Sequence, residues 1–137
     1  IGIVSTLVFF FIVDLKISNL IYIFFSAFFG SFFIGSLGFI TGLWATKFDH
    51  TATITNFIIT PLAFLSGVFY TIDRLPSIFQ TISYYNPFFH IINIFRFGFL
   101  GVSDGEILFG MIYLPFLSFI TWFVAYTLYK NGYKIKT

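Results

Sequence analysis

Charged residues divide this chain into long apolar runs. Three runs without Asp, Glu, Lys or Arg cover residues 17–46, 50–72 and 107–129, with lengths of 30, 23 and 23 residues. An α-helix needs about 20 predominantly apolar residues to cross a bilayer, and each run reaches that length. The runs lack the alternating polarity of membrane β-strands, which are about ten residues long. The pattern therefore predicts transmembrane helices at about 18–46, 51–72 and 107–129.

A fourth apolar stretch, at residues 1–13, is too short to cross a bilayer. At 1.5 Å per residue it reaches roughly 20 Å, whereas the hydrocarbon core is about 30 Å thick. It also lacks the basic region and the small-residue cleavage site of a signal peptide. We therefore expect a partial span at 1–13, in a chain that forms a fragment of one transmembrane domain over residues 1–137.

The uncharged run at residues 75–95 differs from the other runs because polar residues are scattered through it. Asn86-Pro87 lies in its middle, and proline removes a backbone donor and clashes with the preceding helical turn. Each half then has roughly ten residues and reaches about 15 Å, half of the hydrocarbon core. Broken backbone survives at membrane depth only against protein or a water-filled cavity. The sequence predicts a re-entrant helical hairpin, with re-entrant helices at about 75–100, before the last span.

Composition agrees with a membrane protein. Hydrophobic residues make up 58% of the chain and charged residues 9%, and the mean hydropathy is +0.98. A soluble domain carries about 25% charged residues, so lipid must solvate most of this surface. The net charge of +2 gives no argument for a nucleic-acid partner. The predicted fold class is an all-α, polytopic transmembrane helix bundle.

The charge distribution leaves the orientation open. If residues 75–95 return to the side they came from, four basic residues face three across the membrane. If they cross, the count becomes five against two, with the C-terminal tail on the richer side. The excess of Lys and Arg on the cytoplasmic side of membrane proteins favours the crossing alternative. The Asn86-Pro87 break and the polar content favour the returning one.

Small residues recur on the first long run. Ser26, Gly30, Gly38 and Gly42 lie at spacings of four or eight residues, and Gly38-x-x-x-Gly42 fits a helix-packing motif. We expect this face to pack on another helix of the same subunit, in preference to a dimer interface. Pro61 lies inside the second long run, where it should kink the helix.

Catalytic groups do not assemble in this sequence. We find no catalytic triad, metal-binding His pair or phosphate-binding glycine loop. His50 and His90 are expected to be separate interfacial residues. The three long runs carry no ionisable relay of the kind that ion-coupled carriers use. This favours a transporter powered from outside its membrane domain.

Arg96 is the charged residue with the most specific setting, because apolar side chains flank it in Ile94-Phe95-Arg96-Phe97-Gly98. It could clamp the re-entrant helices to a carbonyl or a carboxylate, or face an anionic lipid group. It could equally extend its charged head to the membrane surface from a helix end. The sequence leaves these alternatives open.

An ordered series of motifs runs over about residues 43–101. The series comprises Phe48-Asp49, Asn56-Phe57, Thr60-Pro61, Phe64-Leu65-Ser66-Gly67, Ile72-Asp73, Leu75-Pro76, Asn86-Pro87, Arg96, Gly98 and Gly101. It resembles the core of the type-2 ATP-binding-cassette permeases. One departure is Thr71, where many members carry proline.

The resemblance implies a fold, partners and a location. Family members have six spans, of which this fragment would hold the end of the third through the sixth, with the re-entrant pair on the outer side. It implies a bacterial inner-membrane permease with a cytoplasmic C-terminus, acting as a homodimer with cytoplasmic ATPase subunits and surrounded by lipid. ATP and magnesium would bind the ATPase, and this chain would bind no cofactor and catalyse nothing.

The expected function is export of a polysaccharide, lipid or drug-like substrate. Alternatives from other classes are a secondary carrier or channel-like protein without an ATPase, and a structural subunit of a membrane complex. The candidate structural or transport residues are Pro61, Gly67, Asn86, Pro87, Arg96, Gly38 and Gly42.

Overall fold

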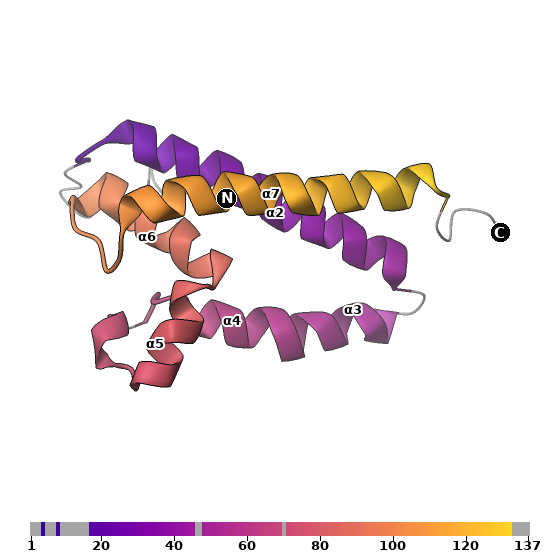
Figure 1. The fold of residues 1–137 in the computed structure, drawn as a ribbon, viewed down its shortest axis with the longest axis horizontal. Helices are drawn as coiled ribbons and strands as arrows, with labels where there is room; N and C mark the ends of the chain where they lie inside the picture. Colours follow the sequence, from indigo (N-terminus) through magenta and orange to yellow (C-terminus); the bar gives the residue numbers. More distant parts are fainter. Residues whose placement is uncertain (1–3, 5–7, 9–16, 46–47, 70, 133–137) are drawn as a thin grey trace.

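Two long helices dominate the molecule. The computed structural model describes residues 4, 8, 17–45, 48–69 and 71–132, in which all regular structure is helical. Figure 1 shows α2 (Leu20–Trp44) crossing α7 (Ile107–Lys130) along the length of the molecule. Within the described part these two helices are long and apolar enough to cross a membrane. The all-helical fold class is confirmed, and the partial span predicted at 1–13 lies outside the described residues apart from Val4 and Val8.

The two long helices meet through small side chains. Ser118 on α7 donates from Oγ to the Phe29 carbonyl on α2 at 3.2 Å, which requires a close approach of the two backbones. Bulky apolar side chains such as Phe24 and Phe116 are instead exposed, as suits a lipid-facing surface. The buried positions recur at helical spacing and are Ser26, Gly30, Phe33 and Ser36 on α2 and Gly110, Leu114, Ser118 and Ala125 on α7.

The next helical stretch is shorter than predicted. It comprises α3 (Phe48–Ile54), a π-helical turn η1 (Thr55–Ile59) and α4 (Thr60–Phe64). The span predicted at 51–72 therefore ends eight residues too late. A turn follows Phe64, and in it Gly67 adopts a left-handed conformation with φ 77° that continues no helix. The apolar residues Val68 and Phe69 continue the uncharged run beyond this turn, so the sequence pattern does not show where the helix ends.

Two shorter helices follow, as the sequence predicted. After a 3₁₀ turn, η2 (Ile72–Arg74), come α5 (Ser77–Tyr84) and α6 (Pro87–Leu100), separated at Asn86. Pro87 takes the first helical position, where no N–H is needed. Figure 1 shows α6 running back to the end of the molecule at which α2 and α7 begin. Re-entry of this pair into a bilayer stays a prediction.

Candidate functional site

The polar side chains of α6 share one face of the helix. Asn86, His90, Asn93 and Arg96 follow one another at spacings of four, three and three residues, which superimposes them on a helix surface. The first three are almost fully buried, with exposed fractions of 2%, 0% and 1%. Each of the four side chains bonds to backbone groups near the ends of other helices. This face is the candidate site.

Asn86 closes the end of α4. Its Nδ2 donates to the Leu62 carbonyl at 2.6 Å, and its Oδ1 accepts from the Phe88 N–H at 3.0 Å. The last carbonyls of a helix lack a partner within that helix, and water cannot supply one in an apolar surrounding. One side chain therefore satisfies the end of α4 and the beginning of α6.

His90 and Tyr113 complete the end of α5. The His90 Nε2 donates to the Tyr84 carbonyl at 2.7 Å, and the Tyr113 hydroxyl donates to the Tyr85 carbonyl at 2.7 Å. The expectation that His90 is interfacial is wrong, because its side chain is fully buried. Its ring lies 5.3 Å from that of Phe109 and 5.1 Å from that of Tyr113. A neutral, hydrogen-bonded imidazole suits such an aromatic surrounding.

Gly110 on α7 makes room for this imidazole. A Cβ at position 110 would lie 3.0 Å from the His90 Nδ1, which has no hydrogen-bond partner among the described residues. The absence of a side chain at Gly110 thus lets α7 approach α6 directly over the histidine. Neither residue was identified as part of a common site from the sequence, because 19 residues separate them in the chain.

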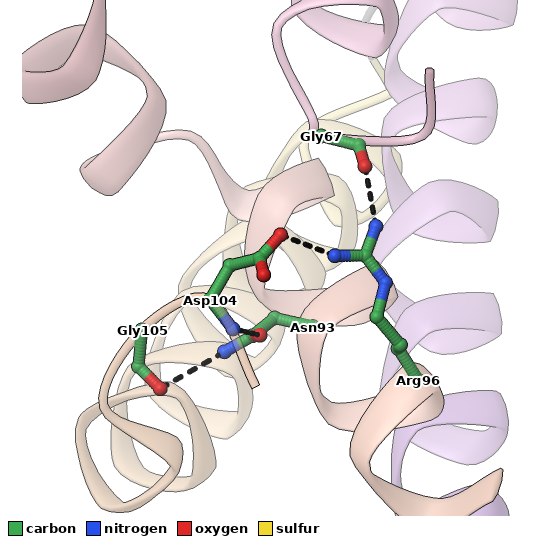
Figure 2. A network of polar contacts seen from close by, with 5 residues as sticks. All are labelled: Gly67, Asn93, Arg96, Asp104 and Gly105. Atoms are coloured by element: carbon green, nitrogen blue, oxygen red, sulfur yellow. Dashed lines mark hydrogen bonds and ion pairs between the residues drawn. The ribbon is translucent and has the colours of Figure 1, made fainter. Parts of the chain in front are cut away.

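Arg96 joins two loops. Its guanidinium donates to the Gly67 carbonyl, in the turn after α4, and to the Asp104 carboxylate, in the loop before α7 (Figure 2). Asn93 supports this loop, since its Oδ1 accepts from the Asp104 N–H at 2.8 Å and its Nδ2 donates to the Gly105 carbonyl at 3.3 Å. Of the sequence alternatives for Arg96, the structure shows the clamp.

The end of α6 meets the beginning of α2 through backbone groups. The Asn19 N–H donates to the Gly98 carbonyl at 2.8 Å, and the Ser18 N–H donates to the Phe99 carbonyl at 3.3 Å. A Cβ at Gly98 would lie 2.6 Å from the Ile23 Cγ1 and 3.0 Å from the Ile23 backbone nitrogen. Only glycine permits this approach.

The structure brings together some of the residues singled out in the sequence. Gly67, Asn86, Pro87 and Arg96 converge around α6, whereas Pro61 lies in the first turn of α4, directly after the π-helical turn. Residues that sequence reasoning did not assign to the site are His90, Asn93, Asp104, Gly105, Gly110 and Tyr113. The helical spacing of the polar α6 residues could have identified His90 and Asn93.

Gly38 and Gly42 lie apart from this site. A Cβ at either position meets nothing within 4 Å among the described residues, whereas Gly30, on the same helix, approaches Ile91 closely. The predicted small-residue face therefore packs within the described part at Ser26 and Gly30 only. Close packing at Gly38 and Gly42 stays a prediction about segments outside that part.

A groove opens between α2 and α7. It has a volume of about 400 Å³ and lies where Gly35 leaves space beside aromatic rings. Its walls are apolar, apart from a few hydroxyl groups. The lining residues are Ser31, Phe32, Gly35, Ser36, Phe39, Trp122, Ala125, Tyr126 and Tyr129.

The sequence matches known membrane transport proteins. Residues 1–100 match the family described as ABC-2 type transporter. The Escherichia coli protein named inner membrane transport permease YadH is 28% identical over 134 residues, which cover 96% of this chain and 52% of the relative. Nodulation protein J of Rhizobium leguminosarum bv. trifolii is 36% identical over 61 residues, covering 44% of this chain and 23% of the relative.

The chain spans about half the length of the YadH proteins that it matches. No solved structure matches it. The family match covers α2 through α6 and so includes most of the polar network, together with the motifs from Asn56 to Gly98. This chain therefore belongs to the ABC-2 type transporter family.

Proposed function

We propose that the chain is the C-terminal part of the permease of an ATP-driven exporter in a bacterial inner membrane. The observation that carries this proposal is the family match over residues 1–100. A second copy of the permease and two cytoplasmic ATPase subunits would complete the transporter, and ATP and magnesium would bind the ATPase. In this proposal the C-terminal tail after α7 is cytoplasmic, and the permease itself hydrolyses nothing.

The helical stretch 48–64 offers a surface for the transported molecule. Thr53, Asn56 and Thr60 follow one another at spacings of three and four residues, so they form a polar stripe on one face. Thr53 and Asn56 are exposed, although apolar side chains such as Phe57 and Ile58 surround them. Exposed amide groups are costly in lipid, so we infer that this stripe faces a polar pathway.

The same stretch is suited to movement. It contacts the rest of the described structure mainly through its two ends, α3 on α2 and α4 on α6. Its middle contains the π-helical turn, where the Thr60 Oγ donates to the Thr55 carbonyl at 2.8 Å, followed by Pro61. Such turns and prolines are common positions of bending in helices. Alternating exposure of a pathway requires bending or tilting of this kind.

The partnership provides the decisive experiment. The full-length permease should co-purify in detergent with a cytoplasmic ATPase in equimolar amounts, and the turnover of ATP should change when the permease is present. A permease of the same fold that transports without any nucleotide-hydrolysing partner would favour the alternative, a secondary carrier or channel-like protein. As a control, an ATPase without a bound permease should show its basal turnover only.

A further inference from the structure

Asp104 is held from two sides in the loop between α6 and α7. Its carboxylate accepts from the Arg96 guanidinium, and its backbone N–H donates to the Asn93 Oδ1 at 2.8 Å (Figure 2). The exposed fractions of the Arg96 and Asp104 side chains are only 22% and 17%. An ion pair that is largely shielded from water responds strongly to the loss of one partner, because the other charge is then uncompensated.

The Arg96 guanidinium also contacts the turn after α4, which contains Gly67. The Nη2 of Arg96 donates a hydrogen bond to the carbonyl of Gly67, a buried residue with φ 77°. The preceding residue, Ser66, is fully buried as well. The planar guanidinium presents its donors in a fixed geometry, so a contact on one edge orients the opposite edge. Asp104 and Gly67 are thus connected through a single rigid group.

We propose that Asp104 is a positioning residue that holds Arg96 on the Gly67 carbonyl and thereby keeps the turn after α4 closed against α6. Without the carboxylate, the long arginine side chain regains rotamer freedom and its charge is drawn toward water. The Gly67 carbonyl then loses its partner and the turn opens. This role concerns the permease alone and is independent of an ATPase partner.

A buried thiol can report on the opening of this turn. Ser66→Cys places a reporter thiol of similar size at the turn, where the serine side chain is fully buried. Ser118→Cys places a control thiol in α7, at a second fully buried position remote from the clamp. The measurement is the rate at which a water-soluble maleimide modifies each thiol in the full-length permease in detergent, after removal of any cysteine upstream of this chain.

Neutral variants at position 104 should expose the reporter thiol selectively. Asp104→Asn and Asp104→Ser should each raise the modification rate of the reporter thiol by between about twofold and a hundredfold, the range expected for directly coupled residues. The rate at the control thiol should not change. Asp104→Glu keeps the carboxylate and should leave the reporter thiol protected. In an Arg96→Gln background, Asp104→Asn should add no further increase.

Three results would overturn the proposal. An unchanged rate at the reporter thiol in both neutral variants would mean that Asp104 holds only its own loop. Equal increases at the reporter and control thiols would show a general loss of packing in place of a local opening. A further increase in the Arg96→Gln background would mean that Asp104 acts on the turn by a route other than Arg96.

Discussion

At the scale of single residues, the site consists of side chains that replace missing backbone partners. Asn86 does so twice, for α4 and for α6. Asn86→Ala should lower the stability of the permease by roughly 2–4 kcal/mol, because a helix cap and the partner of the part-buried Leu62 carbonyl are lost together. The measurement is the thermal unfolding midpoint in detergent. Asn86→Ser keeps a capping oxygen but is too short to replace the bond to the Leu62 carbonyl, so its loss should be smaller.

Gly98 provides a second test at this scale. Gly98→Ala should destabilise the protein by about 1–3 kcal/mol, the usual cost of overpacking, because the new methyl group meets the Ile23 backbone nitrogen at 3.0 Å. Gly35→Ala is the matched control, since its Cβ meets nothing within 4 Å among the described residues. Equal unfolding midpoints for the two alanine variants would contradict the close approach of α6 and α2.

At the scale of elements, the sequence predicted the helices better than their ends. The spans predicted at 18–46 and 107–129 agree with α2 and α7 within two residues at each end, and Asn86-Pro87 located the break between α5 and α6. The end of α4 was missed because a left-handed glycine ended the helix within a continuous apolar run. The π-helical turn was missed because helical periodicity over a few residues does not distinguish 3.6 from a wider turn.

Only part of the candidate site was predictable, because some of its residues are defined by contacts between distant segments and not by local sequence. Motifs identified Asn86, Arg96 and Gly67, which lie within the segment that resembles the permease family. Asp104 and Gly110 lie beyond that segment, and nothing in their local sequence marks them. Their roles arise from contacts across the fold, because α7 returns along α6. Burial of His90 was not predicted, because lone histidines near helix ends are more often interfacial polar residues.

The polar stripe on the helical stretch 48–64 gives a testable prediction at the scale of elements. A cysteine at Asn56 should react readily with a water-soluble thiol reagent in the membrane-embedded, full-length permease, because the stripe faces a wet pathway in our proposal. A cysteine at Ile58, which is 55% exposed and lies on the opposite side of the helix, should face lipid and react slowly. Similar reactivity at the two positions would contradict a polar pathway along this face.

At the scale of the whole molecule, many of the hydrogen bonds that the described residues make between elements lie at one end. Around α6 they join the beginning of α2, the end of α4 and the beginning of α7, whereas α2 and α7 diverge toward their other ends in Figure 1. The end that contains α6 is thus fixed by many directional contacts. In the proposed transport cycle, movement is expected along the helical stretch 48–64, which contacts the rest of the described structure mainly through its two ends.

At the scale of the whole molecule, the prediction concerns the side of the membrane on which each loop lies. Single cysteines at Ser18, Ser77, Ser103 and Thr137 should divide into two groups when a membrane-impermeant thiol reagent is added to intact cells. Positions 18, 77 and 103 should be labelled from outside, and position 137 only after the membrane is opened, because α5 and α6 return to the side they came from. Labelling that places 77 and 103 on opposite sides would instead support a crossing segment.

The backbone contact between α6 and α2 has a consequence for biosynthesis. The amides of Ser18 and Asn19 find their partners at Phe99 and Gly98, about 80 residues later in the chain. A ribosome therefore makes α2, and the two residues just before it, well before the residues that bond these amides in the folded structure. Until α6 has been made, water at the bilayer surface is a suitable partner for these two amides. Closure of this end of the molecule is accordingly a late event, which follows synthesis of α6.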